Sequence, residues 1–299
     1  MRTLGVVILN WNGYQETKKC LDSILNFNNT SALDINFFLI DNNSTDLSGV
    51  KLEKEFGERV HFFNTGFNSG YTGGNNFGIV KAIQGSCNYV LILNNDLKII
   101  NFNAIVKSID QVFQSSPIIG ILGFDIFDCK SKMKQKSNGR SSVFFNYLLD
   151  IKGAITYLDK GVSFESRMSV CGCAICFKVD CISRIGLFDE SFFMYAEEHD
   201  ICLRAIHNKW NVVQITNKYA QIYRKIEVIS SSQLQWYYAS RNIFYAYKNN
   251  LRPVHIFIFS FIQLISYVNK IIFLIFKKEF KIVKKILTGV YDGLFRKKL

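Results

Sequence analysis

The chain has 299 residues, is 48% hydrophobic and contains two prolines, a composition that excludes a disordered protein and allows one large domain with an appendage. Its formal net charge is +12, but ten basic and only two acidic residues lie after residue 251, so the excess belongs mostly to the tail. The tail interleaves lysines with Phe, Ile, Leu and Val. This pattern favours an anionic membrane surface over nucleic acid, for which no binding motif is visible.

The eight cysteines have no regular spacing, and a chain of this size does not need disulfides to fold. The first apolar run is short, has no signal-peptide cleavage site and reads as a strand. We therefore expect reduced thiols and a cytoplasmic location.

Strands and helices alternate along the first 124 residues. Short apolar runs predict strands at 3–9, 35–40, 59–63, 89–93 and 118–124. Helices are expected at 14–27, 46–56, from the end of a Gly/Asn-rich loop to about residue 84, and at 103–114. The alternation predicts an α/β fold with a Rossmann-like, mainly parallel sheet, right-handed crossovers and helices on both faces.

The second half is less regular. The segment 129–142 is basic, has few apolar anchors and predicts a mobile loop. A strand is expected at 169–178, followed by helices at 197–209 and 233–249.

Polar clusters stand where three predicted strands end: Asn10 with Asn12, Asp41, and Asn94 to Asp96. Because the carboxyl ends of parallel strands share one edge of the sheet, where ligands bind, these clusters should converge there. A row of amides and carboxylates suits a polyphosphate, a sugar and a divalent cation.

Two of these acids have specific candidate roles. Asp41 could accept the imino N–H of a uracil or thymine ring, whereas helix capping is the alternative reading for the polar residues 43–46. Asp96 could bind Mg²⁺ or Mn²⁺ and so neutralise a diphosphate leaving group. The alternative for Asp96 is a turn that closes the strand.

The loop 66–78 contains five glycines among its asparagines and resembles a phosphate cradle before a helix. It is neither a Gly-x-Gly-x-x-Gly fingerprint nor a P-loop, and a plain turn is the alternative. The missing fingerprint after the first strand disfavours a dinucleotide-dependent dehydrogenase.

Glu197, Glu198 and Asp200 place three carboxylates in one helical turn beside several aromatic residues. One of them could act as the general base toward an attacking hydroxyl, although the helix dipole alone also favours acids there. The cysteines at 171, 173, 176 and 181 have some zinc-like spacing, but thiols packed on a strand are the favoured interpretation.

Taken in order, these segments resemble the family 2 glycosyltransferases, especially the rhamnosyltransferase-like branch of bacterial surface polysaccharide synthesis. The similar segments are VVILNWNG, FFLIDNNSTD, GFNSGYTGGNNFGI, YVLILNND, CGCAICFKVDCISRIGLFDESFFMYAEEHDICLR and, more loosely, WYYASRNIFYAYK. The resemblance covers about residues 4–248 and implies a GT-A fold, a nucleotide-activated sugar donor, a divalent cation (Mn²⁺ or Mg²⁺) and inversion at the anomeric carbon.

The resemblance also implies residue roles. Asp41 would contact the nucleobase, Asn10 and Asn12 would line the nucleotide pocket, and Asn68, Gly70 and Asn75 would lie near the ribose and diphosphate. Asn94, Asn95 and Asp96 match an Asp-x-Asp-like element with Asp96 as metal ligand, and Gly172 would lie beside the sugar or acceptor. Glu198 would be the base with Glu197 in reserve, and a helical Arg241–Asn242 pair has a less defined role.

Two departures from the family pattern bear on activity. The base position is Glu where Asp is commoner. Arg224 stands where a metal-binding His is often found, and it could instead pair with the diphosphate as a fixed cation. The second departure raises the alternative of a catalytically inactive GT-A scaffold in a membrane polysaccharide-assembly complex.

The expected organisation is a GT-A domain over 1–250, with a nucleotide-binding half (1–100) and an acceptor and catalytic half (101–250), followed by a basic, apolar membrane-association segment over 251–299. The run 253–276 is long enough to span a bilayer, but an in-plane membrane helix or a helical pair packed on the sheet domain is favoured, with a buried core helix as the alternative.

The expected function is transfer of a sugar from a UDP- or dTDP-linked donor, dTDP-rhamnose among the candidates. The expected acceptor is a lipid-linked or growing polysaccharide of the O-antigen or capsule type. The enzyme would work as a peripheral protein at the cytoplasmic face of the cell membrane.

Overall fold

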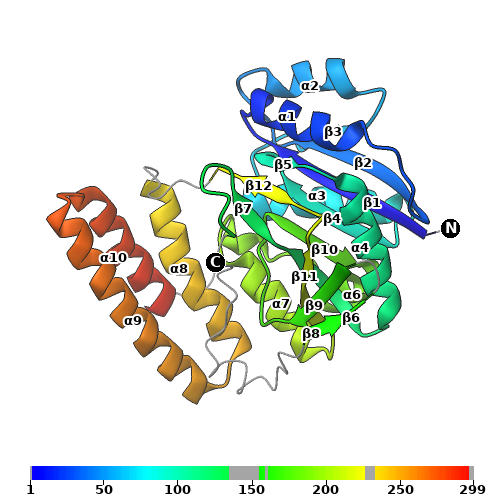
Figure 1. Ribbon diagram of the computed structural model, residues 1–299. Helices are drawn as coiled ribbons and strands as arrows, with labels where there is room; N and C mark the ends of the chain where they lie inside the picture. The colour runs from blue at the N-terminus through cyan, green and yellow to red at the C-terminus, as the bar shows by residue number, and fades with distance from the viewer. Residues whose placement is uncertain (1, 135–154, 159–160, 226–232, 296–299) are drawn as a thin grey trace.

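A computed structural model describes residues 2–134, 155–158, 161–225 and 233–295 (Figure 1). The loop predicted at 129–142 lies outside the described residues from position 135 on. The strands are β1 (Arg2–Asn10), β2 (Leu33–Asp41), β3 (His61–Asn64), β4 (Tyr89–Asn94), β5 (Leu97–Ile99), β6 (Ile119–Phe124), β7 (Ile126–Asp128), β8 (Ile155–Tyr157), β9 (Val162–Ser166), β10 (Ala174–Lys178), β11 (Asn211–Asn217) and β12 (Ile222–Arg224). The helices are α1 (Tyr14–Leu25), α2 (Ser48–Phe56), α3 (Gly70–Gln84), α4 (Phe102–Ser115), α6 (Val179–Ile185), α7 (Glu197–His207), α8 (Gln233–Asn250), α9 (Pro253–Phe276) and α10 (Phe280–Phe295).

The central sheet has the strand order β3-β2-β1-β4-β10-β6-β11-β9-β8. Its first four strands are parallel, as the βαβ alternation predicted. β10 runs antiparallel to both β4 and β6, and β9 runs antiparallel to β11. A second sheet, β5-β12-β7, joins segments that are far apart in the sequence.

Helices cover both faces of the central sheet (Figure 1). Alternate residues of β1 point to opposite faces: Val6 and Ile8 pack with α1 and α4, whereas Val7 packs with α3. Both faces of β1 and β4 are therefore buried, which explains why these strands read as continuous apolar runs.

The prediction of a loop over 66–78 was wrong, because helix α3 already begins at Gly70. A Cβ atom on Gly78 would lie 2.3 Å from Val7 Cγ1, and one on Gly74 would lie 2.5 Å from Leu9 Cδ1. These glycines therefore let α3 approach β1 closely, and their clustering reflects helix–strand packing.

Strand β10 is also shorter than predicted, since it starts at Ala174 instead of residue 169. The residues just before it form a tight turn, in which the Ala174 amide donates to the Cys171 carbonyl at 3.4 Å. This turn carries Gly172 and lies beside the end of β4, where the Asn94 amide donates to the Cys173 carbonyl at 2.9 Å.

Helices α8, α9 and α10 form a three-helix layer beside the sheet (Figure 1). A Cβ atom on Gly289 would lie 2.5 Å from the Tyr237 carbonyl, and one on Gly293 would lie 2.6 Å from the Arg241 carbonyl. The two glycines thus allow α10 to pack tightly on α8.

Helix α9 is long and apolar enough to cross a membrane, the one such helix in the described part of the chain. Only 11% of its most apolar window is buried. The interpretation of 253–276 as a buried core helix is therefore wrong.

Candidate functional site

A chain of side-chain hydrogen bonds links the carboxyl ends of β1, β2 and β4. Asn10 lies opposite Asp41 in the parallel ladder and donates to its carboxylate at 2.8 Å. The Thr17 hydroxyl donates to the side-chain oxygen Oδ1 of Asn10 at 2.7 Å and accepts from the side-chain nitrogen Nδ2 of Asn95 at 2.9 Å. The predicted convergence of the strand-end clusters is thus confirmed for Asn10, Asp41 and Asn95.

The Asp41 carboxylate is 2% exposed and is already occupied by protein donors. Besides Asn10, it accepts from both the amide and the hydroxyl of Ser44 and from the Asn64 side chain at 3.0 Å. These four bonds match the capacity of a carboxylate. A nucleobase could bond to Asp41 only by replacing one of these donors. Asn64 is the most exposed of the three residues that supply them.

Capping explains only part of residues 43–46. The Asp46 carboxylate accepts from the amide of Ser48, the first residue of α2, at 2.9 Å. The rest of this loop is tied to the loop after β1. The amide nitrogen of Asn12 donates to the Ser44 hydroxyl at 3.0 Å, and its side-chain oxygen accepts from the Thr45 amide at 2.8 Å. Asn12 remains exposed at this rim.

The first amides of α3 do not form a free phosphate cradle. The amides of Tyr71 and Thr72 donate to the carbonyl of Phe193, and the Gly70 amide donates to Asn68. Gly70 has φ +72°, and Phe193 occupies the space where its side chain would stand. The amino end of α3 is therefore bound to the loop that precedes α7.

Asn68 and Asn75 lie in different surroundings. Asn68 is exposed and accepts from the Asn42 side chain at 3.1 Å. Asn75 is buried, donates to the Tyr71 carbonyl at 2.9 Å, and leaves its side-chain oxygen without a partner in the structure. Of the two, only Asn68 faces solvent at the rim.

Asp96 forms an ion pair with Arg224, whose Nε lies 2.7 Å from the carboxylate. The pair exists because Arg224 lies opposite Leu97 in the small antiparallel β5–β12 ladder. The two side chains are 35% and 33% exposed, so this pair remains open to a ligand.

The expected divalent cation would find one carboxylate at this position. Within the described ranges, no three His, Cys, Asp or Glu side chains gather to hold a metal. The buried side-chain oxygen of Asn94 has no hydrogen-bond partner and offers a further oxygen at the same strand end. Since Mg²⁺ is often held by one or two carboxylates plus substrate phosphates, the residues fit a cation shared with a bound diphosphate.

Glu197 and Glu198 stand in the first turn of α7 but differ in burial. Glu197 is 5% exposed, and one of its carboxylate oxygens has no partner in the structure. Burial, with the neighbouring Glu198 carboxylate, raises the pKa of Glu197 well above its ordinary value. Burial thus favours the protonated form of Glu197, whereas the Glu198 side chain is 17% exposed and is the more accessible candidate base of the two.

The Gly172 turn faces this pair. A Cβ atom on Gly172 would lie 3.5 Å from the Glu198 Cβ and 3.6 Å from a Glu197 carboxylate oxygen. The Tyr71 hydroxyl donates to the Gly172 carbonyl at 2.7 Å. A side chain at position 172 would therefore project into the space beside the acids.

Cys171 and Cys173 flank Gly172 with their sulfur atoms 3.1 Å apart. The hydrogen bond from Cys173 lowers the pKa of Cys171, and the same contact raises the pKa of Cys173 well above its ordinary value. Cys171 is partly exposed, whereas Cys173 is buried. The interpretation of both as thiols packed on a strand was wrong, because β10 begins only at Ala174 and Cys171 and Cys173 lie in the turn before it.

The loop before α7 is strained and held by Asn242. Phe193, Tyr195 and Ala196 have φ values of 61°, 68° and 65°, which are unfavourable for residues with a side chain. The Asn242 side chain donates to the carbonyls of Phe192, Met194 and Tyr195 at 2.7–3.0 Å. Asn242 thus fixes the backbone from which Glu197 and Glu198 extend.

The surroundings of Tyr195 connect the Asp96–Arg224 pair with the two acids of α7. Burial raises the pKa of its hydroxyl. The Glu197, Glu198 and Asp96 carboxylates raise that pKa further, while Arg224 opposes them. The Asp96–Arg224 pair and the acids of α7 therefore lie around the same aromatic side chain, next to the Gly172 turn.

Residues 5–111 match the family model of glycosyl transferase family 2. The hexosyltransferase Agl10 of low-salt glycan biosynthesis from Haloferax volcanii is 25% identical over 213 residues, which cover 71% of this chain and 64% of that protein. The match thus supports a family 2 domain but does not single out the rhamnosyltransferase-like branch.

Solved structures confirm the GT-A fold. The mannosyltransferase PcManGT from Pyrobaculum calidifontis, solved with GDP-Man and Mn²⁺, has a TM-score of 0.62 at 10% identity and covers 98% of this chain and 87% of its own. Residues 1–349 of S. aureus TarS, solved with UDP-GlcNAc, have a TM-score of 0.57 at 15% identity and cover 86% of this chain and 69% of their own. This chain spans less than two thirds of the length of Agl10 and of the longer TarS chain.

Several residues of the site had no predicted role. They are Thr17, Asn42, Asn64 and Tyr71. These residues act through contacts between segments far apart in the sequence, which no local pattern reveals. The Cys-Gly-Cys spacing is a local signal, but it favours thiols packed on a strand or a zinc site and does not predict two thiols in contact.

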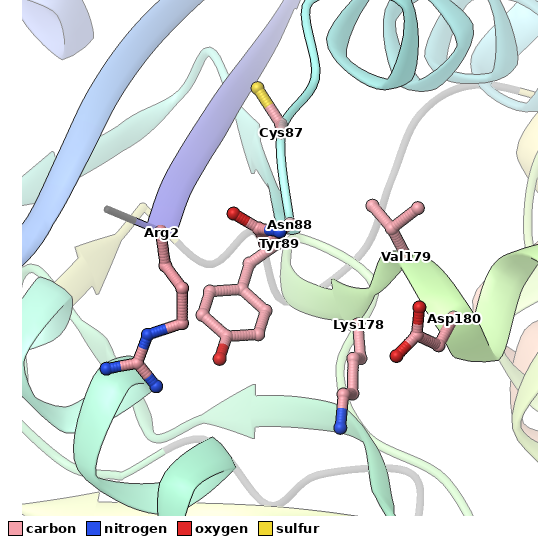
Figure 2. Close-up of a pocket in the computed structure, with 7 residues that line it drawn as sticks. All are labelled: Arg2, Cys87, Asn88, Tyr89, Lys178, Val179 and Asp180. Carbon is pink, nitrogen blue, oxygen red and sulfur yellow. The ribbon is translucent and has the colours of Figure 1, made fainter.

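A cavity of about 320 Å³ lies at the opposite edge of the sheet (Figure 2). It is lined by Arg2 at the start of β1, Tyr89 at the start of β4 and Lys178 at the end of β10. The Arg2 guanidinium pairs with Asp110 at 3.1 Å. This cavity is separate from the strand-end site described above.

Proposed function

We propose that this protein is an inverting glycosyltransferase that moves a sugar from a UDP- or dTDP-linked donor to a saccharide acceptor. The observation that carries the proposal is the pairing of a buried Glu197, whose pKa is raised, with a more exposed Glu198 beside the Gly172 turn. The Asp96–Arg224 pair acts on the same Tyr195 side chain as these acids. The family match and the nucleotide-sugar complexes of PcManGT and TarS support it.

Glu198 is proposed to remove the proton of the attacking acceptor hydroxyl. A base must be ionised before the reaction and must be accessible to the hydroxyl. Burial favours the protonated form of Glu197, so Glu198 is the better candidate within the pair. Gly172 leaves room for the sugar beside Glu198. Inversion follows because the hydroxyl attacks from the side opposite the departing diphosphate.

Arg224 is proposed to stabilise the charge that develops on the diphosphate. Its guanidinium is held by Asp96 and is still one-third exposed, so it can bond to phosphate oxygens without reorientation. Asp96, with the oxygen of Asn94, would hold a divalent cation. Such a cation would supply further positive charge to the leaving group.

The nucleotide is proposed to lie along the rim formed by Asn12 and Asn68, the exposed residues of the predicted pocket. Asn10 and Asp41 would then support the pocket from below through their buried hydrogen bonds. Direct contact of Asp41 with the base would require Asn64 to move.

The test is release of nucleoside diphosphate from a panel of UDP-, dTDP- and GDP-sugars, followed by mass spectrometry with and without saccharide acceptors. Arg224→Gln should retain the fold and lower turnover about 10²-fold, as loss of one charge-stabilising donor typically does. Lys218→Gln, an exposed cation outside the site, is the control. Equal turnover of Arg224→Gln and the wild type would contradict the role of Arg224.

The alternative, a catalytically inactive scaffold, rests on Arg224 at the position of the expected His. Calorimetry with UDP, dTDP and Mn²⁺ separates the two functions. Nucleotide binding with donor turnover supports the transferase, and absence of both supports the scaffold. A rhamnosyl donor and an O-antigen or capsule pathway remain predictions that the donor panel also addresses.

We further propose that α9 and α10 lie in the interface of an anionic membrane leaflet, where they bring the site to a lipid-linked acceptor. The exposed apolar side chains of α9 include Phe257, Phe261 and Phe276, which are 61–83% exposed. Five lysines would meet lipid phosphates: those at positions 277 and 278 follow α9, and those at 281, 284 and 285 lie on α10.

The test is cosedimentation of the full chain with vesicles of phosphatidylcholine alone or mixed with phosphatidylglycerol. We expect binding to the anionic vesicles, which weakens with salt and is lost when Phe257, Phe261 and Phe276 are changed together to Ser. Phe67→Ser, an equally exposed Phe on the sheet domain, is the control. Unchanged binding by the triple variant would argue against this orientation.

A further inference from the structure

We infer that Cys171 and Cys173 are a reversible thiol–disulfide modification site within the candidate active site. Their sulfur atoms are 3.1 Å apart and face each other across the Cys171–Ala174 turn. Both are free thiols in the structure. The inference that oxidation controls activity rests on the proposed transferase function, whereas disulfide formation itself does not.

The two thiols differ in access, which sets the order of the reaction. Cys171 is partly exposed and Cys173 is buried. A peroxide would therefore meet Cys171 first, and the lowered pKa of this thiol favours the reactive thiolate. Cys173 is then in position to resolve the oxidised Cys171 sulfur.

The reaction balances with hydrogen peroxide as oxidant. The Cys171 thiolate attacks one peroxide oxygen, the O–O bond breaks, and a sulfenic acid and hydroxide form. The Cys173 sulfur then attacks the Cys171 sulfur, the S–O bond breaks, and the proton of the Cys173 thiol leaves with the departing oxygen as water. The two thiols are oxidised to one disulfide, and the peroxide is reduced to two waters.

Oxidation must deform the turn that separates the cysteines. A disulfide bond is about 2 Å long, so the sulfur atoms must approach each other from 3.1 Å. Two bonds tie this turn to the site: Tyr71 to the Gly172 carbonyl at 2.7 Å and the Asn94 amide to the Cys173 carbonyl at 2.9 Å. Gly172, without a side chain, lets the peptide rotate.

Deformation of this turn would displace groups next to the acids of α7 and next to Arg224. The Gly172 position lies within van der Waals distance of Glu197 and Glu198. On the other side, the Arg224 charge acts on both thiols, so this cation lies close to the pair. A shift of the turn by about 1 Å can reduce turnover by about 10²-fold.

The experiment measures chemistry and activity separately in the full chain. Reduced protein is treated with hydrogen peroxide, and peptide mass spectrometry is used to detect loss of two hydrogens from the peptide that contains residues 171–173. We expect this loss in the wild type and in Cys129→Ser, which removes the other partly exposed cysteine of the described part of the chain. We expect no such loss in Cys171→Ser or Cys173→Ser.

Activity is then compared before and after oxidation. After treatment with peroxide, wild-type turnover should fall about 10²-fold and return with dithiothreitol, whereas Cys171→Ser, which cannot form the disulfide, should keep the turnover it has before treatment. Absence of the 171–173 disulfide in the mass spectrum would overturn the modification site. A disulfide that forms without loss of turnover would overturn its control of activity, and inactive reduced protein would instead contradict the proposed function.

Discussion

At the level of single residues, burial separates the roles of two adjacent carboxyl groups. Glu197 and Glu198 are chemically identical and share one helical turn, so the sequence alone could only rank them. In the structure, Glu197 is enclosed, which raises its pKa, whereas Glu198 is more exposed beside the Gly172 turn. The assignment of the base therefore follows from a difference in solvent access.

The raised pKa of Glu197 predicts how stability depends on pH. Between the ordinary Glu value and the raised value, the folded state keeps a proton that the unfolded state has lost, so stability falls as pH rises. Glu197→Gln cannot lose that proton, and its stability should fall less over the same range. Urea unfolding from about pH 4 to about pH 9, on both sides of neutrality, measures the difference.

Glu53→Gln is the matched control for this experiment, because Glu53 is an exposed residue on α2. Its stability should follow the wild-type dependence on pH. Identical pH profiles for Glu197→Gln and the wild type would show that Glu197 is ionised in the folded protein.

At the level of single elements, helix α3 illustrates how a glycine-rich segment can be misread. Its glycines suggested a phosphate loop, but Gly74 and Gly78 face β1, and the first amides of the helix bond to Phe193 and Asn68. Local sequence could not distinguish the two arrangements, because the difference lies in what packs against the glycines.

Gly78→Ala should destabilise the fold by about 1–3 kcal/mol through overpacking. The added Cβ would lie 2.3 Å from Val7 Cγ1 in a fully buried contact, and this clash should outweigh the better helix propensity of alanine. Denaturant unfolding measures this change in the free energy of unfolding. Val80→Ala on the exposed side of α3 should have little effect, and an equally stable Gly78→Ala would refute close packing here.

The loop before α7 depends on α8 in the same way. Asn242→Ala removes three hydrogen bonds from a backbone with three unfavourable φ values, so the loop should relax and displace the acids. Turnover should fall about 10²-fold, with faster hydrogen exchange of the amides around residues 192–196. Asn249→Ala, on the exposed side of α8, is the control. Unchanged hydrogen exchange in Asn242→Ala would show that the conformation of the loop does not depend on Asn242.

At the level of the whole molecule, the sequence predicted the elements of the parallel half and the meeting of their polar ends. Asn10 and Asp41 stand in register because adjacent parallel strands end together, a rule that needs no coordinates. The Asp96–Arg224 pair could not be predicted, because it depends on the β5-β12-β7 sheet, whose strands have three residues each.

The packing of the C-terminal helices also could not be predicted from the sequence. Composition predicted a basic, apolar tail, but only the structure shows that α9 leaves most of its apolar surface open while α10 packs on α8 through Gly289 and Gly293. Since α8 also carries Asn242, the three-helix layer is connected directly to the loop that positions the acids. The tail is thus joined to the site as well as to its proposed membrane surface.

The most direct measurement of the central proposal is the turnover of Glu198→Gln with a donor that the wild type uses, alongside calorimetry of nucleotide binding. Glutamine keeps the shape of the side chain but cannot accept the acceptor's proton, so turnover should fall about 10²- to 10⁴-fold while nucleotide affinity stays the same. Wild-type turnover by Glu198→Gln would contradict the assignment of this carboxylate as the base.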